Sequence, residues 1–203
     1  MARNLRFLWV LLPYLAVFWG MMLTRSAWGA LIGFHLALLP LLLPNWKQAR
    51  RLLAPVSRHI LLPLTFGGLA AGPLLWLLWP LGGILPDYPA RVEALRLRCE
   101  TWPLFLAYFS LVNPFLEEWY WRGVLGNDSP RPRLIDFLFA GYHIIIMLLF
   151  AAPVWVCIGF LVLAGVSWGW RQSVRLSGSL LPAALSHLLA DVSVLSMLYV
   201  LAC

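Results

Sequence analysis

The chain has 203 residues, of which 62% are hydrophobic and only 11% are charged, and its formal net charge is +7. A soluble domain is close to half apolar and a quarter charged, so this composition predicts an integral membrane protein throughout. The basic residues lie in short loops between apolar runs, which is typical of topology signals and not of a nucleic-acid surface. We therefore expect a lipid bilayer as the environment and no nucleic-acid partner.

Helices of about 20 apolar residues are needed to cross a hydrocarbon core of roughly 30 Å. Seven segments approach this length: 5–23, 27–44, 60–80, 104–125, 135–151, 153–170 and 180–200. Strand-like alternation is absent, and an open sheet cannot lie in lipid. The predicted fold class is therefore all-α, a polytopic membrane bundle of about seven transmembrane helices (six to eight). The fifth and sixth segments are separated only by Ala152-Pro153, which leaves a re-entrant or steeply kinked helix open.

The distribution of basic residues predicts the orientation, because positively charged loops stay cytoplasmic. With the N-terminus inside and an uncleaved first helix, ten basic residues are cytoplasmic: Arg3, Arg6, Lys47, Arg50, Arg51, Arg58, Arg131, Arg133, Arg171 and Arg175. The outer side then receives Arg25, Arg91, Arg96 and Arg98. Val92, Leu95, Cys99 and Trp102 follow helical spacing, so we expect an amphipathic helix on the outer surface. A bacterial inner (plasma) membrane is the expected location.

Single residues outside the main motifs are interpreted as structural. The three cysteines show no paired spacing, which argues against a disulfide framework or a thiolate zinc site, and Cys157 is expected to be a small packing residue. Gly165-x-x-x-Gly169 predicts a close approach of two helices. His35 is expected to face the bundle, and His59 to lie at the interface.

Ionisable side chains in hydrocarbon cost several kcal/mol, so those that a membrane chain retains usually have a function. They occur here in three motifs: Glu117-Glu118-x-x-x-Arg122, Phe139-x-x-x-His143 and His187-x-x-x-Asp191. From the predicted span ends, each motif lies about seven or eight residues from the cytoplasmic surface, or roughly 11–13 Å deep. This shared depth predicts one polar site.

Helical spacing separates the two adjacent carboxylates. Glu118 and Arg122 are i and i+4 with the acid first, the favourable order for an ion pair. Glu117 is rotated by about 100° and shares a face with Asn113 and Trp121. We therefore expect Glu117 to be a free, water-activating base and Glu118 to fix Arg122. The alternative is a buried ion cluster that only holds helices together.

The two histidines complete a general acid–base set. His143 is the natural partner for the attacking water, and Phe139 is expected to pack on the same helical face. His187 could donate from Nε2 to the oxyanion that forms when water attacks a peptide carbonyl. An ionised Asp191 would repel that oxyanion, so it is either protonated, orients His187 or binds a cation. The alternative that His187 and Asp191 only hydrogen-bond to each other, without a catalytic role, is left open.

The three motifs, here EEWYWR, FAGYH and HLLAD, together resemble those of the CPBP family of intramembrane proteases (CAAX protease and bacteriocin-processing, also called Abi). The resemblance covers about residues 104–195 of a single integral-membrane protease domain, 1–203; residues 1–103 add N-terminal spans and the outer helix. It implies a glutamic-type mechanism without a metal cofactor. Glu117 and His143 would activate water, and His187 with residue 191 would stabilise the oxyanion.

The resemblance also indicates the class of substrate. Type II CAAX endopeptidases of this family have Asn where this chain has Asp191. The composition looks bacterial, and related bacterial members include myxosortase-like proteins that are thought to process C-terminal sorting tails. We therefore expect a membrane-anchored protein or peptide as the substrate.

Two alternatives remain open. The first is a zinc-dependent membrane hydrolase in which Glu117, His143, His187 and Asp191 are ligands. The second is a non-catalytic immunity or scaffold membrane protein that binds a peptide in the same cavity. A transporter is less favoured because inverted repeats are absent from the sequence. The oligomeric state and the cleaved bond are not specified by the sequence.

Overall fold

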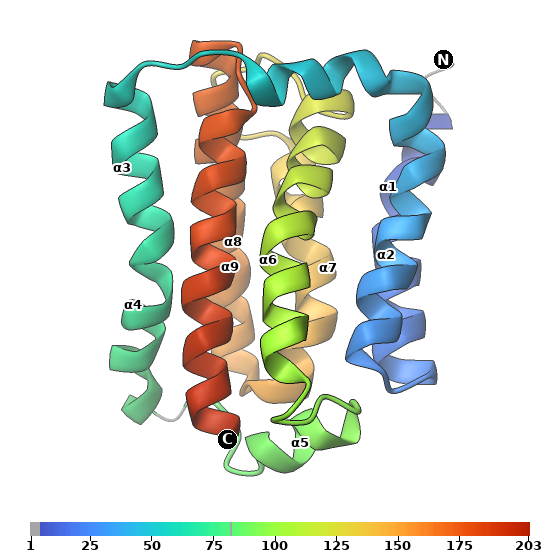
Figure 1. Ribbon diagram of the computed structural model, residues 1–203, viewed down its shortest axis with the longest axis vertical. Helices are drawn as coiled ribbons and strands as arrows, with labels where there is room; N and C mark the ends of the chain where they lie inside the picture. Colours follow the sequence, from blue (N-terminus) through green and yellow to red (C-terminus); the bar gives the residue numbers. More distant parts are fainter. Residues whose placement is uncertain (1–4, 82) are drawn as a thin grey trace.

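The computed structural model describes residues 5–81 and 83–203 as a bundle of helices that lie side by side (Figure 1). Apart from an isolated bridge between Ile84 and Ala151, no β structure occurs in these residues, which confirms the all-α prediction. The elements are α1 (Leu5–Phe18), η1 (Trp19–Leu23), α2 (Ala27–Leu42), η2 (Leu43–Leu53), α3 (Arg58–Leu69), α4 (Ala71–Leu78), η3 (Trp79–Leu81), α5 (Tyr88–Ala94), α6 (Trp102–Glu118), η4 (Trp119–Val124), α7 (Leu134–Phe150), α8 (Pro153–Ser177) and α9 (Leu181–Ala202).

The helical lengths suit a membrane protein. Four helical segments of the described chain are long and apolar enough to cross a bilayer: Ala27–Leu53, Arg58–Leu81, Pro153–Ser177 and Leu181–Ala202. Leu8–Leu23 and Leu134–Phe150 are shorter apolar helices. Each of the seven predicted segments falls on a helix. Both α7 and α8 extend along the bundle (Figure 1), and α8 continues to Ser177, beyond the predicted end at 170.

Local sequence explains where these helices begin and end. Pro153 stands in the first turn of α8, where its missing N–H is not needed. Gly178 ends α8 in the left-handed conformation (φ 71°), which glycine adopts without strain. Pro182 stands in the first turn of α9. These residues therefore set where α8 begins and ends and where α9 begins, and both helices line the polar centre.

The segment after α2 turns away from the bundle axis. Figure 1 shows η2 running across the end of the bundle, and Trp46, Lys47 and Arg50 on it are exposed or partly exposed. The carbonyl of Arg51 accepts hydrogen bonds from Leu180 N and from Ser179 Oγ, which joins η2 to the start of α9. This position agrees with a basic interfacial segment. Arg3, another predicted topology signal, lies outside the described residues.

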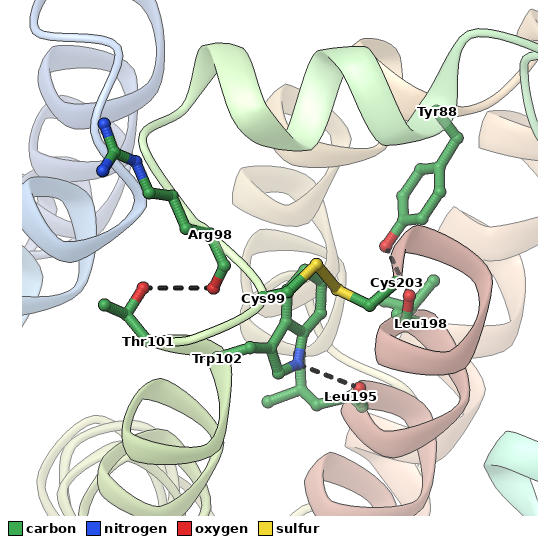
Figure 2. The surroundings of a disulfide bond; sticks show 8 residues. All are labelled: Tyr88, Arg98, Cys99, Thr101, Trp102, Leu195, Leu198 and Cys203. Atoms are coloured by element: carbon green, nitrogen blue, oxygen red, sulfur yellow. Dashed lines mark hydrogen bonds between the residues drawn. A yellow bond between two sulfur atoms is a disulfide. The ribbon is translucent and has the colours of Figure 1, made fainter.

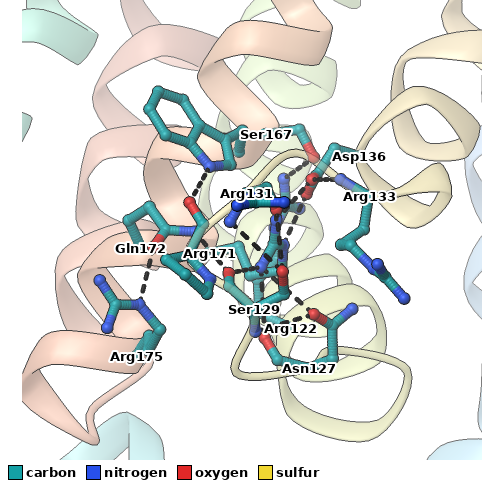
Figure 3. Close-up of polar contacts among 12 residues, drawn as sticks. Arg122, Asn127, Ser129, Arg131, Arg133, Asp136, Ser167, Arg171, Gln172 and Arg175 are labelled. Atoms are coloured by element: carbon teal, nitrogen blue, oxygen red, sulfur yellow. Dashed lines mark hydrogen bonds and ion pairs between the residues drawn. The ribbon is translucent and has the colours of Figure 1, made fainter.

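Arg171, predicted as a loop topology signal, is instead buried within α8. Its guanidinium donates to both carboxylate oxygens of Asp136 at 2.7 and 2.8 Å, and to the carbonyls of Ser129 and Arg131 (Figure 3). Asp136 also accepts from the backbone N–H of Arg133, at the start of α7. Bidentate Arg–carboxylate pairs are strong and directional. This network therefore fixes the loop between η4 and α7 against α8.

The predicted outer amphipathic helix is shorter than expected. Only α5 is helical, and the chain then turns at Arg96, which has a positive φ of 58°. Val92, Leu95 and Leu97 are nevertheless buried against the end of the bundle that α5 crosses in Figure 1. The apolar spacing therefore predicted the buried face correctly but not the break in the helix.

A disulfide joins Cys99 to Cys203 across 104 residues of sequence, with 5.8 Å between their Cα atoms, so the prediction of no disulfide was wrong (Figure 2). Sequence spacing could not show that the start of α6 and the end of α9 meet. Trp102 Nε1 donates to the carbonyl of Leu195 nearby. Disulfides persist in oxidising compartments, which supports an outer C-terminus, although the orientation stays a prediction. Cys157 is exposed, so its predicted packing role was also wrong.

Close helix packing occurs at different glycines from those predicted. A Cβ atom on Gly165 or Gly169 would meet nothing within 4 Å, so their assigned packing role was wrong. A Cβ atom on Gly68 would clash with the backbone carbonyl of Ser186, and one on Gly72 with that of Ser193. The pair Gly68-x-x-x-Gly72 therefore lets α3 and α4 approach α9. The contact at Gly68 is with Ser186, which directly precedes His187.

We expect Gly68→Ala to destabilise the protein, because the new methyl group has backbone rather than a movable side chain in its way. Overpacking of this kind costs about 1–3 kcal/mol. Thermal unfolding in detergent measures the effect. Gly67→Ala is the matched control, since Gly67 is exposed and its Cβ would meet open space. Equal unfolding temperatures for the two variants would contradict the role given to Gly68.

Candidate active site

Three helices bring the three sequence motifs together inside the bundle. Glu117 and Glu118 lie near the end of α6, His143 lies on α7, and His187 lies on α9. The exposed fractions of Glu117, Glu118 and His187 are 3%, 0% and 5%. The predicted single polar site is therefore observed as a spatial cluster, and none of these three side chains faces outward.

Glu118 is the centre of a buried ionic network. Its Oε1 accepts a hydrogen bond from Arg122 Nη1 at 3.0 Å, as the i, i+4 spacing predicted, and lies 3.0 Å from His187 Nδ1. Because a carboxylate only accepts, Nδ1 of His187 carries the hydrogen of that bond. Arg122 also donates to Ser167 Oγ on α8 at 2.9 Å, and its guanidinium lies 4.0 Å above the Phe139 ring. The network thus connects α6, α7, α8 and α9.

Glu117 faces a different direction from Glu118. Its Oε1 accepts a 2.7 Å hydrogen bond from the Tyr142 hydroxyl. The carboxylate was predicted to be free, but one of its two oxygens is held by this bond. Its Oε2 is buried and has no hydrogen-bond partner among the described residues. Tyr142 was missed by sequence reasoning, although it directly precedes His143 in the motif FAGYH. The result is one fixed and one available carboxylate oxygen.

His143 has a defined orientation beside this carboxylate. Its Nδ1 lies 3.0 Å from the carbonyl oxygen of Phe139, one turn earlier, so Nδ1 carries a hydrogen and donates it. The imidazole stacks on the Tyr142 ring, with 4.1 Å between the centroids. Nε2 makes no hydrogen bond to another described residue. In the neutral ring this nitrogen has a lone pair to offer.

A cavity of about 70 Å³ joins these groups. Glu117, Tyr142, His143 and Asn113 contribute its polar lining. The remaining lining is apolar and comes from Val17, Met21, Ala27, Ala30, Leu31, Phe34, Phe105, Phe109 and Ile146. A buried water needs roughly 10–15 Å³, so the cavity has room for several waters or for an apolar side chain. Glu117 and His143 therefore face one small space.

His187 and Asp191 lie on the other side of Glu118. Asp191 Oδ1 is 3.6 Å from His187 Nε2, and its Oδ2 has no partner among the described residues. The His187 ring stacks on Trp170, with centroids 4.6 Å apart. These two residues are not among those that line the cavity. The structure therefore places them at the Glu118 network and not directly against His143.

A second group of polar side chains surrounds Asn113. His35 on α2 is buried, with Nδ1 at 3.2 Å from the Tyr108 hydroxyl and Nε2 at 3.2 Å from Asn113 Oδ1. The expectation that His35 faces the bundle is confirmed. Asn113 lies one turn before Glu117, as the predicted shared face required. The expected interfacial residue His59 is exposed at the start of α3.

The donor atoms do not fit a zinc ion in this arrangement. Within the described residues, no group of three or more His, Cys, Asp and Glu side chains is arranged to hold a metal. Of the four ligands in the zinc alternative, Glu117 and His143 line the cavity, whereas His187 and Asp191 do not. His187 Nδ1 is also engaged by Glu118.

We expect Arg122→Ala to lower stability strongly, because it leaves the carboxylate of Glu118 buried without its cation. Breaking a buried pair in this way costs about 3–5 kcal/mol. Thermal unfolding of the purified protein in detergent measures the loss. Arg175→Ala, at an exposed position of α8, should change the free energy of unfolding by no more than about 0.5 kcal/mol. A small effect at both positions would mean that Glu118 does not depend on Arg122.

Comparison with known proteins supports the interpretation of these motifs. No curated protein and no solved structure matches the chain. A family model described as type II CAAX prenyl endopeptidase Rce1-like matches residues 100–193, slightly less than half of the chain. The match includes all three motifs. Residues 100–193 are therefore similar to the Rce1-like type II CAAX prenyl endopeptidases.

Proposed function

We propose that this protein is an intramembrane endopeptidase of glutamic type, in which Glu117 and His143 activate a water molecule. One observation carries the proposal most directly. Glu117 and His143 come from different helices and line the same small cavity, each with one polar atom fixed and one available. The family of residues 100–193 supports the reaction class.

Water activation follows from the available atoms. A water between Glu117 Oε2 and His143 Nε2 can donate one hydrogen to each of them. Glu117 Oε2 then takes a proton as the water oxygen attacks the peptide carbonyl, and later returns it to the leaving amine nitrogen. Tyr142 holds the other oxygen of Glu117, so the carboxylate keeps its orientation during the transfer. No metal is needed for this sequence of steps.

His187 has the role of stabilising negative charge on the carbonyl oxygen. Its Nδ1 hydrogen is directed to Glu118, so donation from Nε2 requires a ring that carries both hydrogens. Carboxylates on either side, those of Glu118 and Asp191, would stabilise such a cation. In this proposal Asp191 charges and orients His187 and does not itself touch the oxyanion, which accommodates Asp at this position.

The proposed substrate is a membrane-embedded or membrane-tethered segment of another protein. Nine of the thirteen residues that line the cavity are apolar, which favours an apolar side chain next to the cleaved bond. The cavity of about 70 Å³ has room for a side chain but not for a helix about 10–12 Å wide, so we propose that the substrate segment is unwound at the cleaved bond. The myxosortase-like subtype and the identity of the substrate stay predictions.

We expect Glu117→Gln to abolish cleavage and Tyr142→Phe to slow it, because the first removes the base and the second only the hydrogen bond that orients it. Loss of a general base costs about 10²–10⁴-fold in rate. Mass spectrometry of membrane proteins from cells with wild-type or variant protein measures the released tail. Glu93→Gln, at an exposed position, is the control for a lost carboxylate. Full cleavage by Glu117→Gln would end this assignment.

Exhaustive chelation should leave the cleavage rate of the purified protein unchanged, since no step passes through a metal ion. The measurement is the rate before and after dialysis against a strong chelator, and again after zinc is added back. Activity that disappears on chelation and returns with zinc would favour the metal-dependent alternative and would contradict the glutamic mechanism.

A further inference from the structure

We infer that Asn113 is a further catalytic residue, whose side-chain amide donates a hydrogen bond to the oxyanion from within the cavity. This inference rests on the proposed endopeptidase function. It concerns a polar group that the proposed water activation leaves unused. The group consists of Tyr108, Asn113 and His35, and it connects α6 with α2.

The position of Asn113 matches the reaction centre. Asn113 is buried, it lies one helical turn before Glu117, and both residues line the cavity that His143 also lines. By contrast, the lining of that cavity does not include His187. An oxyanion formed by attack of a water held at Glu117 and His143 lies within this space. A donor that borders the cavity would act on this oxyanion in addition to His187, and Asn113 is the amide that borders it.

The hydrogen bonds around Asn113 determine which of its atoms is available. His35 Nε2 lies 3.2 Å from Asn113 Oδ1, and an amide oxygen can only accept, so Nε2 donates. His35 Nδ1 then accepts from the Tyr108 hydroxyl at 3.2 Å. The oxygen of the amide is thereby engaged by His35. The NH₂ group has two hydrogens to donate. A hydrogen bond to the carboxylate of Asp191 uses one of them, and the other is available.

A preorganised amide of this kind is suited to transition-state stabilisation. Donors that are already oriented toward developing charge act strongly in a buried site, because they need no reorganisation when the charge appears. The chain from Tyr108 through His35 provides that orientation without using the donor. Tyr108 and His35 are therefore positioning residues, and Asn113 is the group that would contact the reacting oxygen.

The test uses three substitutions at one position. Asn113→Asp keeps the shape and the acceptor for His35 but removes the donor, Asn113→Ala removes both, and Asn113→Ser retains a smaller donor. The probe is a synthetic peptide that spans the bond cleaved by the wild-type protein, presented in detergent micelles. For Asn113→Asp and Asn113→Ala, kcat should fall about 10²–10³-fold with KM little changed. Asn113→Ser should retain more activity than either.

A control and a second variant separate this role from a structural one. Ser110→Ala alters a buried side chain one turn earlier on α6, whose hydroxyl has no partner among the described residues, and should leave kcat unchanged. Tyr108→Phe should lower kcat less than Asn113→Asp, because it acts only through His35. A structural role predicts the opposite order, in which Asn113→Asp, the closest in shape, is the most active.

The outcomes distinguish this inference from the proposed function. If Glu117→Gln is inactive while Asn113→Asp cleaves at the wild-type rate, the role of Asn113 is overturned and the endopeptidase proposal stands. If Asn113→Asp loses affinity for the peptide and not turnover, Asn113 binds substrate and the inference is also overturned. If the wild-type protein and Glu117→Gln give the same membrane proteins, the proposed function fails first and the inference fails with it.

Discussion

The site depends on one constraint, which is that the carboxylate of Glu118 is removed from water and must be compensated within the protein. Arg122 from the same helix and His187 from α9 provide that compensation, and both approach the same oxygen at 3.0 Å. The pair also fixes geometry, because Arg122 reaches Ser167 on α8 and covers the ring of Phe139 on α7. One buried charge thus determines how the helices around the site meet.

Two neighbouring glutamates can have different roles because an α-helix turns by about 100° per residue. Glu118 is directed into the ionic network, whereas Glu117 is directed to the cavity, where Tyr142 engages only one of its oxygens. The same separation applies to the histidines. His187 belongs to the Glu118 network, and His143 shares the cavity with Glu117. The ionic network and the candidate reactive cavity therefore use different atoms.

Sequence reasoning predicted the features that local periodicity determines. Apolar run lengths indicated the helices, and the i, i+4 rule indicated the ion pair between Glu118 and Arg122. It could not predict contacts between segments distant in sequence. The Cys99–Cys203 disulfide and the clash-limited approach of Gly68 to α9 depend on how helix ends and faces meet in space. Tyr142 was missed for a similar reason, because nothing local shows that its hydroxyl faces α6.

The two ends of the bundle are held by different means, and this affects the site between them. At one end, the Cys99–Cys203 disulfide joins the start of α6 to the end of α9. Toward the other end, the Asp136–Arg171 pair joins α7 to α8. The four helices that carry Glu117, His143, Ser167 and His187 are therefore cross-linked in pairs outside the reactive space. Catalytic groups need support of this kind, since a displacement of about 1 Å can cost 10²-fold in rate. The cavity that Glu117 and His143 line can then stay unfilled by side chains, because rigidity is supplied by contacts that do not occupy it.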